Sequence, residues 1–338
     1  MKIKAIFTVI AFAVAAYADA ASIGNINGIG NINNVNANNI NKNTRFNENN
    51  VDGLKPSSNQ PNDSKANAGI KIQVTKVSRQ LVENWIKVYK SVRPDVNIEI
   101  VDKGEDANIA IVNDAAHGAV TNVARYAILP VTSVENPLYN EISHKQWSEK
   151  DLKKLFFQTE DDLLDDADSK SKKEKLSDKL TVISGNNSAS ASAAFAKHFG
   201  FKKGDIRGKR IAGDDKFLLN AIQKDQQSVT FNNLAYLYDL TSRQLKQNIS
   251  VLPLDVKKEQ ANVLESGNLD EIIKLVESSE IETIPVENIA FSLNVFNSDV
   301  DNFLSWVVTD GQQYNNKSGF LKLDPKDAKQ QLALLTQK

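Results

Sequence analysis

Small polar residues gather at one point of the sequence, directly after an apolar run. Residues 180–183 are apolar apart from Thr181, and the next nine residues, 184–192, contain four serines and one glycine. Small side chains let the backbone approach a ligand, hydroxyls can donate to it, and the first N–H groups of a following helix attract anions. The turn therefore fits an oxyanion site, although serines also cap helices without any ligand. The candidate ligand residues here are Ser184, Ser188, Ser190 and Ser192.

Other polar residues stand where predicted strands end or predicted helices begin. Residues 74–78, Val-Thr-Lys-Val-Ser, open the first helix, and an aspartate after the third strand could accept a proton from a protonated anion. Arg125 and Lys76 could supply positive charge, but a surface or hinge position suits them equally. Asn and Asp also favour turns, so turn chemistry alone is the alternative. The candidates outside the serine turn are Thr75, Lys76, Ser78, Asn113, Asp114, Arg125 and Asn232.

Catalytic and metal-binding patterns are weak. His198 follows Ser192 in the same predicted helix, but no motif adds the carboxylate that a triad needs, and no G-x-S-x-G occurs. The acidic residues between 161 and 166 lack the spacing and glycine of an EF-hand. We predict a protein that is not an enzyme and has no metal or cofactor.

Composition excludes several further classes. The 338 residues include 41 Lys and Arg, 42 Asp and Glu, and no Cys, for a net charge of −1. A protein that coats nucleic acid would be strongly basic, so we expect no nucleic-acid partner. Disulfides, thiolate metal sites and cysteine nucleophiles are absent. At roughly 150 residues per domain, the length suggests about two domains.

The first 20 residues resemble a secretory signal. Lys2 and Lys4 precede about a dozen apolar residues, and residues 18–20, Ala-Asp-Ala, form a small-x-small cleavage pattern. Cleavage near Ala20 predicts a periplasmic or secreted protein, and the lack of cysteine excludes a lipoprotein. The alternative is an uncleaved membrane anchor, but the apolar run is shorter than the roughly 20 residues of a spanning helix.

An asparagine-rich segment follows the predicted signal. Asparagine supplies 13 of the 30 residues from 21 to 50, and proline and serine are frequent up to residue 65. Such a polar segment buries too little apolar area to offset its chain entropy, so we predict a disordered leader over residues 21–68. A β-solenoid start or a prion-like assembly segment is the alternative.

Strand and helix patterns alternate from Gly69 onward. Period-2 or wholly apolar runs predict strands at 70–74, 96–101, 107–112, 126–131, 180–183, 228–231, 249–254 and 289–293. Helical spacing predicts a helix over 81–89 that stops before Pro94, and others near 148–157, 193–199, 214–224, 269–277 and 300–309. Ser148 is the expected N-cap of its helix. This alternation predicts a layered α/β fold.

Four segments in this order carry a family resemblance: 125–131, 148–157, 184–192 and, most specifically, 303–314. On these segments the chain from about Gly69 to Leu335 resembles phosphate-type periplasmic substrate-binding proteins of ABC transporters, particularly a branch of Bacteroidetes-like bacteria. The resemblance implies a two-lobed Venus-flytrap fold, with a first lobe at 69–148 and 248–338 and a second at 149–247. It also implies a monomer that closes on a small oxyanion such as phosphate and serves an ABC permease.

The serine turn departs from the family pattern. Phosphate binders of this type usually carry Arg followed by Ser-Gly-Thr at this position, whereas this chain has Ile183 and Ser184 and then Ser-Ala-Ser at 188–190. A guanidinium forms bidentate bonds to phosphate that hydroxyls do not replace. The alternative function is therefore an exported interaction or structural protein that kept the fold and lost ligand binding.

Overall fold

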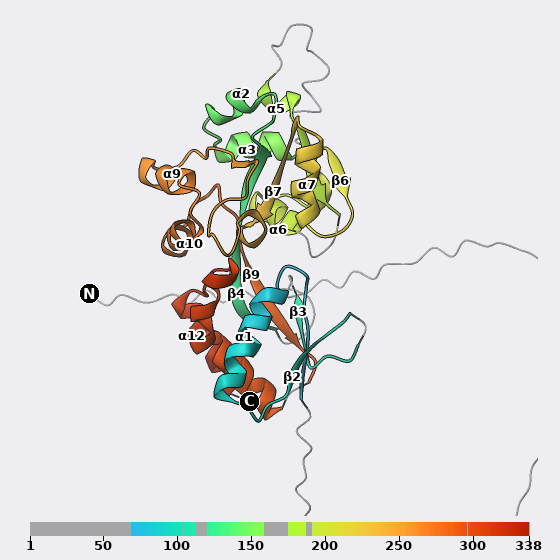
Figure 1. Cartoon of the computed structure of the whole chain (residues 1–338), viewed down its shortest axis with the longest axis vertical. Coiled ribbons are helices and arrows are strands. Elements are labelled where there is room, and N and C mark those ends of the chain that lie inside the picture. Colours follow the sequence, from blue (N-terminus) through green and yellow to red (C-terminus); the bar gives the residue numbers. More distant parts are fainter. Residues whose placement is uncertain are drawn as a thin grey trace, which may run out of the picture. The chain divides into compact units, whose positions relative to one another are not determined.

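The computed structural model describes residues 69–103, 105–112, 120–158, 175–186, 191–295 and 297–337 (Figure 1). All of them belong to one compact unit, Asp63–Lys338. The predicted signal and leader lie outside the described residues, and so do Asn113, Asp114, Ser188, Ser190 and the acidic residues between 161 and 166.

One sheet runs through this unit. In spatial order its strands are β2 (Ile98–Val101), β1 (Ile70–Gln73), β3 (Ile109–Val112), β9 (Val286–Leu293), β4 (Val120–Ser133), β7 (Ser228–Asn233), β5 (Thr181–Gly185) and β6 (Lys209–Ile211), and β8 (Ile249–Val251) also pairs with β4. Strand β1 pairs in parallel with β2 and with β3, and strand β5 pairs in parallel with β6 and with β7. Parallel strands need crossover connections, which helices commonly provide.

Strand β4 joins two lobes. Its residues 120–127 pair antiparallel with β9, and residues 128–132 pair antiparallel with β7. We call the part built on β1, β2, β3, β9 and residues 120–127 the first lobe, and the part built on β5, β6, β7, β8 and residues 128–133 the second lobe. The predicted α/β fold of two sheet-based lobes flanked by helices is confirmed. The residue limits that we predicted for the lobes stay predictions.

Helices cover both lobes (Figure 1). They are α1 (Arg79–Val92), α2 (Tyr139–Ser143), α3 (Glu149–Phe156), α5 (Leu176–Lys179), α6 (Ala191–His198), α7 (Lys216–Lys224), α8 (Leu234–Leu237), α9 (Lys258–Glu265), α10 (Leu269–Ser278), α11 (Ser298–Val308) and α12 (Pro325–Thr336), with 3₁₀ turns η1 (Lys203–Asp205), η2 (Asp310–Tyr314) and η3 (Asn316–Ser318). Helices α2, α8, α9 and α12 and strand β6 were not predicted, and β4 begins six residues before the predicted strand.

Local sequence explains several element ends. Helix α1 buries Leu81, Val82, Trp85 and Tyr89 on one face and ends just before Pro94. The predicted N-cap of α3 is confirmed, because Ser148 Oγ accepts from the Asp151 N–H at 3.2 Å and the Asp151 carboxylate accepts from the Ser148 N–H. This reciprocal pair is a capping box.

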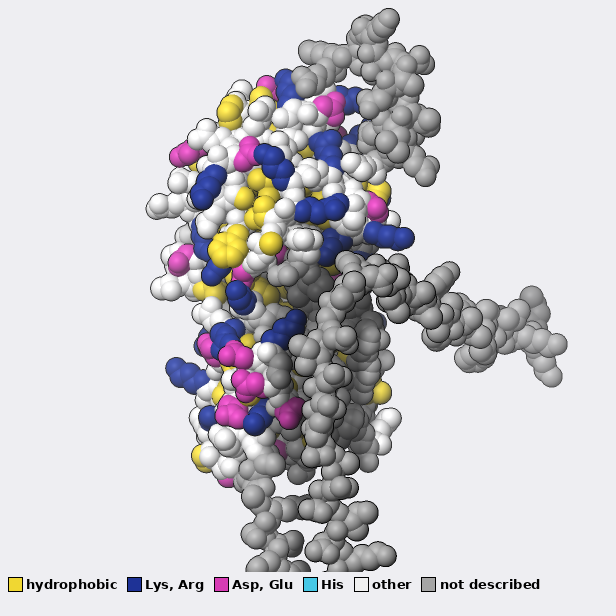
Figure 2. Space-filling view, turned by 90° about the vertical axis from the view of Figure 1, so that its right-hand side faces the viewer, with side chains coloured by type: hydrophobic (Ala, Val, Ile, Leu, Met, Phe, Trp, Pro, Cys, Tyr) yellow, Lys and Arg dark blue, Asp and Glu magenta, His cyan; other side chains and the backbone are white. Residues whose placement is uncertain are grey.

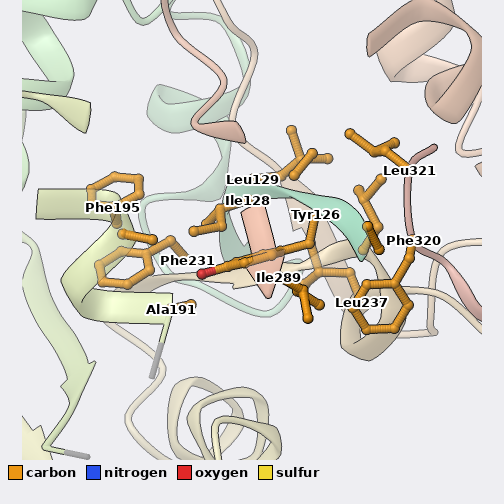
Figure 3. Close-up of a cluster of buried hydrophobic side chains, with 14 of the residues drawn as sticks. Tyr126, Ile128, Leu129, Ala191, Phe195, Phe231, Leu237, Ile289, Phe320 and Leu321 are labelled. Carbon is orange, nitrogen blue, oxygen red and sulfur yellow. The ribbon is translucent and has the colours of Figure 1, made fainter. Parts of the chain in front are cut away.

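Aromatic side chains fill the core where the two lobes meet. Phe195 of α6 stacks on Phe231 of β7 with ring centroids 3.9 Å apart and planes 5° apart. Figure 3 shows the buried cluster continuing from these rings past Tyr126 and Ile289 to Phe320. The apolar core therefore passes from the second lobe into the first without a break, and any ligand site between the lobes borders this core.

Candidate functional site

A small cavity lies where the two lobes meet. Its volume is about 10 Å³, which is room for one water molecule. The first lobe contributes side chains from the start of α1, from β4, from β9 and from the segment after η3, and the second lobe contributes the first residue of α6, the residue before α7 and the end of β7. The lining residues are Val77, Tyr126, Ala191, Asp215, Asn233, Ile289 and Phe320.

Asp215 is the charged residue of this lining. Its Oδ2 accepts a hydrogen bond from the backbone N–H of Ala191, the first residue of α6, at 2.6 Å. Its Oδ1 is buried and has no hydrogen-bond partner among the described protein atoms, and the residue as a whole is 9% exposed. The N-terminus of α6, at the end of the predicted serine turn, thus binds a carboxylate oxygen that belongs to the chain itself.

The turn before α7 directs Asp215 away from its own helix. Asp214 Oδ1 accepts from the Lys216 N–H at 3.0 Å, so Asp214 does the local capping, while the side chain of Asp215 makes no capping bond to α7. Asn232, buried at the end of β7, donates from Nδ2 to the Asp215 carbonyl at 2.7 Å. Asn232, a predicted ligand residue, therefore fixes the backbone that carries Asp215.

Burial dominates the electrostatics of the site. It raises the pKa of Asp215 from 3.8 to about 6; the N–H of Ala191 opposes this shift and the charge of Asp214 adds to it. Burial, with smaller effects of Glu287 and Asp215, raises the pKa of Tyr126 far above its usual value. The Tyr126 hydroxyl is directed toward Phe231 and Ala191 (Figure 3), so a neutral phenol lies beside the helix terminus.

The predicted ligand turn before α1 is closed on itself. The hydroxyls of Thr75 and Ser78 lie 2.7 Å apart, and Ser78 Oγ also accepts from the Thr75 N–H at 3.1 Å. Ser78 is fully buried, Lys76 is exposed, and Val77 is the residue of this turn that lines the cavity. The hydroxyls of this turn are thus engaged with each other.

Arg125 contacts the C-terminal segment. Its Nε donates to the carbonyl of Lys322 at 2.7 Å, and its backbone exchanges two hydrogen bonds with Leu321. The guanidinium is not part of the cavity lining. Arg125 therefore holds residues 321–322 against β4, next to Phe320, and its charged group lies outside the cavity lining.

Two of the predicted serines are described, and both are buried. Ser192 Oγ accepts from the Gly185 N–H at 2.9 Å, which closes the turn between β5 and α6, and Ser184 lies within β5. His198, considered with Ser192 as a catalytic pair, places Nε2 2.7 Å from the carbonyl oxygen of Glu282. The structure brings Ser184, Ser192 and Asn232 to the same end of the second lobe as Asp215.

Apart from a wider pocket of about 420 Å³ beside α10, which is lined by Asp270, Ile273, Lys274, Glu277, Ser278, Asn316 and Lys322, the described residues offer few other sites. No group of three or more acidic or histidine side chains among them is placed to hold a metal ion. Within the same residues, no helix is both long and apolar enough to cross a membrane. On the face seen in Figure 2, Lys and Arg side chains are scattered among acidic, polar and apolar ones.

Sequence reasoning missed three residues of the cavity that carry polar side chains: Tyr126, Asp215 and Asn233. Tyr126 is the first residue of the buried strand predicted over 126–131, where it reads as a core residue. The pair Asp214-Asp215 follows Gly213 at the start of the helix predicted over 214–224. One acidic residue is enough to cap a helix, so the second one was a signal for another role. Asn233 directly follows the candidate Asn232, after the strand predicted over 228–231.

Comparisons with known proteins locate similar folds. No family model matches the chain, and no curated protein sequence matches it. It is similar to an ABC-type phosphate transport receptor from Vibrio cholerae, with 9% identity, 75% of this chain and 100% of that chain covered, and a TM-score of 0.47. It is also similar to PstS from Borrelia burgdorferi, with 14% identity, 75% and 98% covered, and a TM-score of 0.43.

A third similar structure comes from a regulator. The regulatory domain of MetR, a LysR family regulator from N. meningitidis, shares 9% identity, with 76% of this chain and 98% of that chain covered and a TM-score of 0.43. All three similarities have TM-scores below 0.5 and identities of 14% or less.

Proposed function

We propose that this chain is an exported solute-binding protein that captures a small oxyanion, phosphate or a similar anion, between its two lobes for an ABC permease. The observation that carries the proposal is the hydrogen bond from the Ala191 N–H to a carboxylate oxygen at 2.6 Å. A helix N-terminus that holds a carboxylate has the donors and the partial positive charge that an external oxyanion would use.

Entry of a ligand requires the lobes to separate. The cavity of about 10 Å³ accommodates one water, and a tetrahedral oxyanion is several times larger. The lobes are linked across this site by an ion pair between Lys197 of α6 and Glu287 of β9, 2.9 Å apart, with the lysine side chain 74% exposed. An ion pair with an exposed lysine contributes little free energy, so this pair by itself does not prevent the lobes from separating. Ligand binding would shift the population between open and closed forms.

Thermal unfolding with a panel of anions tests the proposal. Phosphate, sulfate, molybdate and small carboxylates would each be added to protein that had been unfolded and refolded, which removes any carried-over ligand. A specific anion at 100 times its dissociation constant should raise the unfolding free energy by about 2.7 kcal/mol and the melting temperature with it. No shift with any of these anions, in buffers matched for ionic strength, would refute the proposal.

A second function has an observation in its favour. The single charged residue of the cavity lining is acidic, and the lining leaves space for about one water. These features also suit an exported interaction or structural protein that kept the fold and lost its ligand. The same panel separates the two functions, because an interaction protein of this kind should melt at one temperature in all of the anions.

A further inference from the structure

Asp215 occupies the position that the proposed anion would take. Its Oδ2 lies 2.6 Å from the Ala191 nitrogen, at the N-terminus of the eight-residue helix α6. Its Oδ1 is buried without a partner, and the side chain faces the cavity between the lobes. A buried carboxylate oxygen without a partner is costly, so this arrangement is not one that packing alone favours.

The local structure does not require this carboxylate. Asp214 already accepts from the Lys216 N–H, and the side chain of Asp215 makes no capping bond to α7. None of the ion pairs of the described residues involves Asp215. The titratable groups that act on it or respond to its charge are Asp214, Tyr126 and Tyr236, and none of them is a cation.

We propose that Asp215 is a specificity-determining residue that competes, within the molecule, with external anions for the N-terminus of α6. This inference rests on the proposed function. An incoming anion must replace the carboxylate at the Ala191 N–H and must also tolerate its negative charge nearby. Asn232 holds the Asp215 backbone through a bond of 2.7 Å, so the carboxylate leaves the Ala191 N–H by rotation of its side chain and stays near the site.

The competition predicts weak binding in the native chain. When a binding-competent state is only a fraction of the population, the apparent dissociation constant rises by the inverse of that fraction. Removing the carboxylate should therefore tighten the binding of phosphate or sulfate by about tenfold or more, where tenfold corresponds to about 1.4 kcal/mol. A neutral amide at the same position should have a smaller effect, since it keeps the shape and loses the charge-assisted bond.

Titration calorimetry with phosphate and with sulfate tests the inference on the refolded chain. The variants are Asp215→Ala and Asp215→Asn, and each is first checked for a cooperative unfolding transition; if the alanine variant does not fold, the asparagine variant carries the test. Asp301→Ala is the matched control, because Asp301 Oδ1 is also buried without a partner but Asp301 lies in α11 and does not line the cavity.

The outcomes separate the inference from the proposed function. Tighter anion binding by the Asp215 variants, with Asp301→Ala equal to the native chain, supports the inference. Equal or weaker binding by the Asp215 variants overturns the inference and leaves the proposed function standing; weaker binding would mean that Asp215 holds the ligand. Binding of neither phosphate nor sulfate by any variant overturns the inference, and the proposed function falls with it only if molybdate and the small carboxylates also leave the melting temperature unchanged.

Discussion

Replacing Asp215 with asparagine should change how stability depends on pH. In the folded chain its pKa is about 6, whereas the ordinary value is 3.8, a difference of about 2 units. Each unit corresponds to 1.36 kcal/mol, so the charged carboxylate costs the folded state roughly 3 kcal/mol relative to the protonated one. The neutral amide of Asp215→Asn avoids this cost at every pH.

The sign of the effect follows from the raised pKa. Between pH 4 and pH 6 the folded chain holds a proton on Asp215 that the unfolded chain has released, so the stability contributed by protonation is complete below pH 4 and is lost as the pH rises through 6. The unfolding free energy of the native chain minus that of Asp215→Asn should therefore fall by about 2.4 kcal/mol between pH 4 and pH 7.

Urea unfolding followed by tryptophan fluorescence measures this difference, since Trp85 and Trp147 are fully buried. Both proteins carry the other titrating groups, among them Asp151, whose pKa is lowered by its bonds to Lys145 and Ser148 against the opposing effect of burial. Their contributions cancel in the difference. A difference that is flat or that rises over this range would refute the reasoning about Asp215.

Two further substitutions test the fold around the site. Ser148→Ala removes the capping hydroxyl of α3 and should lower the unfolding free energy in urea by about 1 kcal/mol; an unchanged midpoint would contradict the capping argument. Gly319→Ala should cost more, because Gly319 has φ +77° and an added Cβ would lie 2.8 Å from the Cα of Ala235. The left-handed conformation alone costs about 1–2 kcal/mol. The melting temperature measures this loss of stability, and Gly204→Ala is the control because a Cβ at Gly204 would meet nothing within 4 Å.

Elements with a strong local signal were predictable. The apolar spacing of α1 and the Ser148 cap depend on residues within one or two turns of each other, and both agree with the structure. The N-terminal part of β4 was missed because residues 120–125 include polar and charged side chains, and their strand conformation depends on pairing with distant β9. Local propensity cannot supply such a partner.

The candidate site was predictable only in part. The serine turn and Asn232 point to the end of the second lobe where the cavity lies, because small polar residues at strand ends are visible in sequence. The bond between Ala191 and Asp215 joins residues 24 apart in the chain, and nothing local distinguishes Asp215 from Asp214 beside it. Which of two adjacent carboxylates caps its own helix and which one reaches another helix is decided by tertiary packing.

The sharing of β4 has a consequence for how the chain folds. Val120 pairs with Ser292 and Val131 pairs with Thr230, so each lobe completes its sheet with a strand that the other lobe also needs. Because one continuous strand carries both sets of pairings, ordering one part of β4 favours ordering of the other, which couples the folding of the two lobes. Because these pairings join residues far apart in sequence, loop-closure entropy opposes them and folding should be slow for a chain of this size. A fragment that contains a single lobe should therefore be less stable than the same lobe within the whole chain.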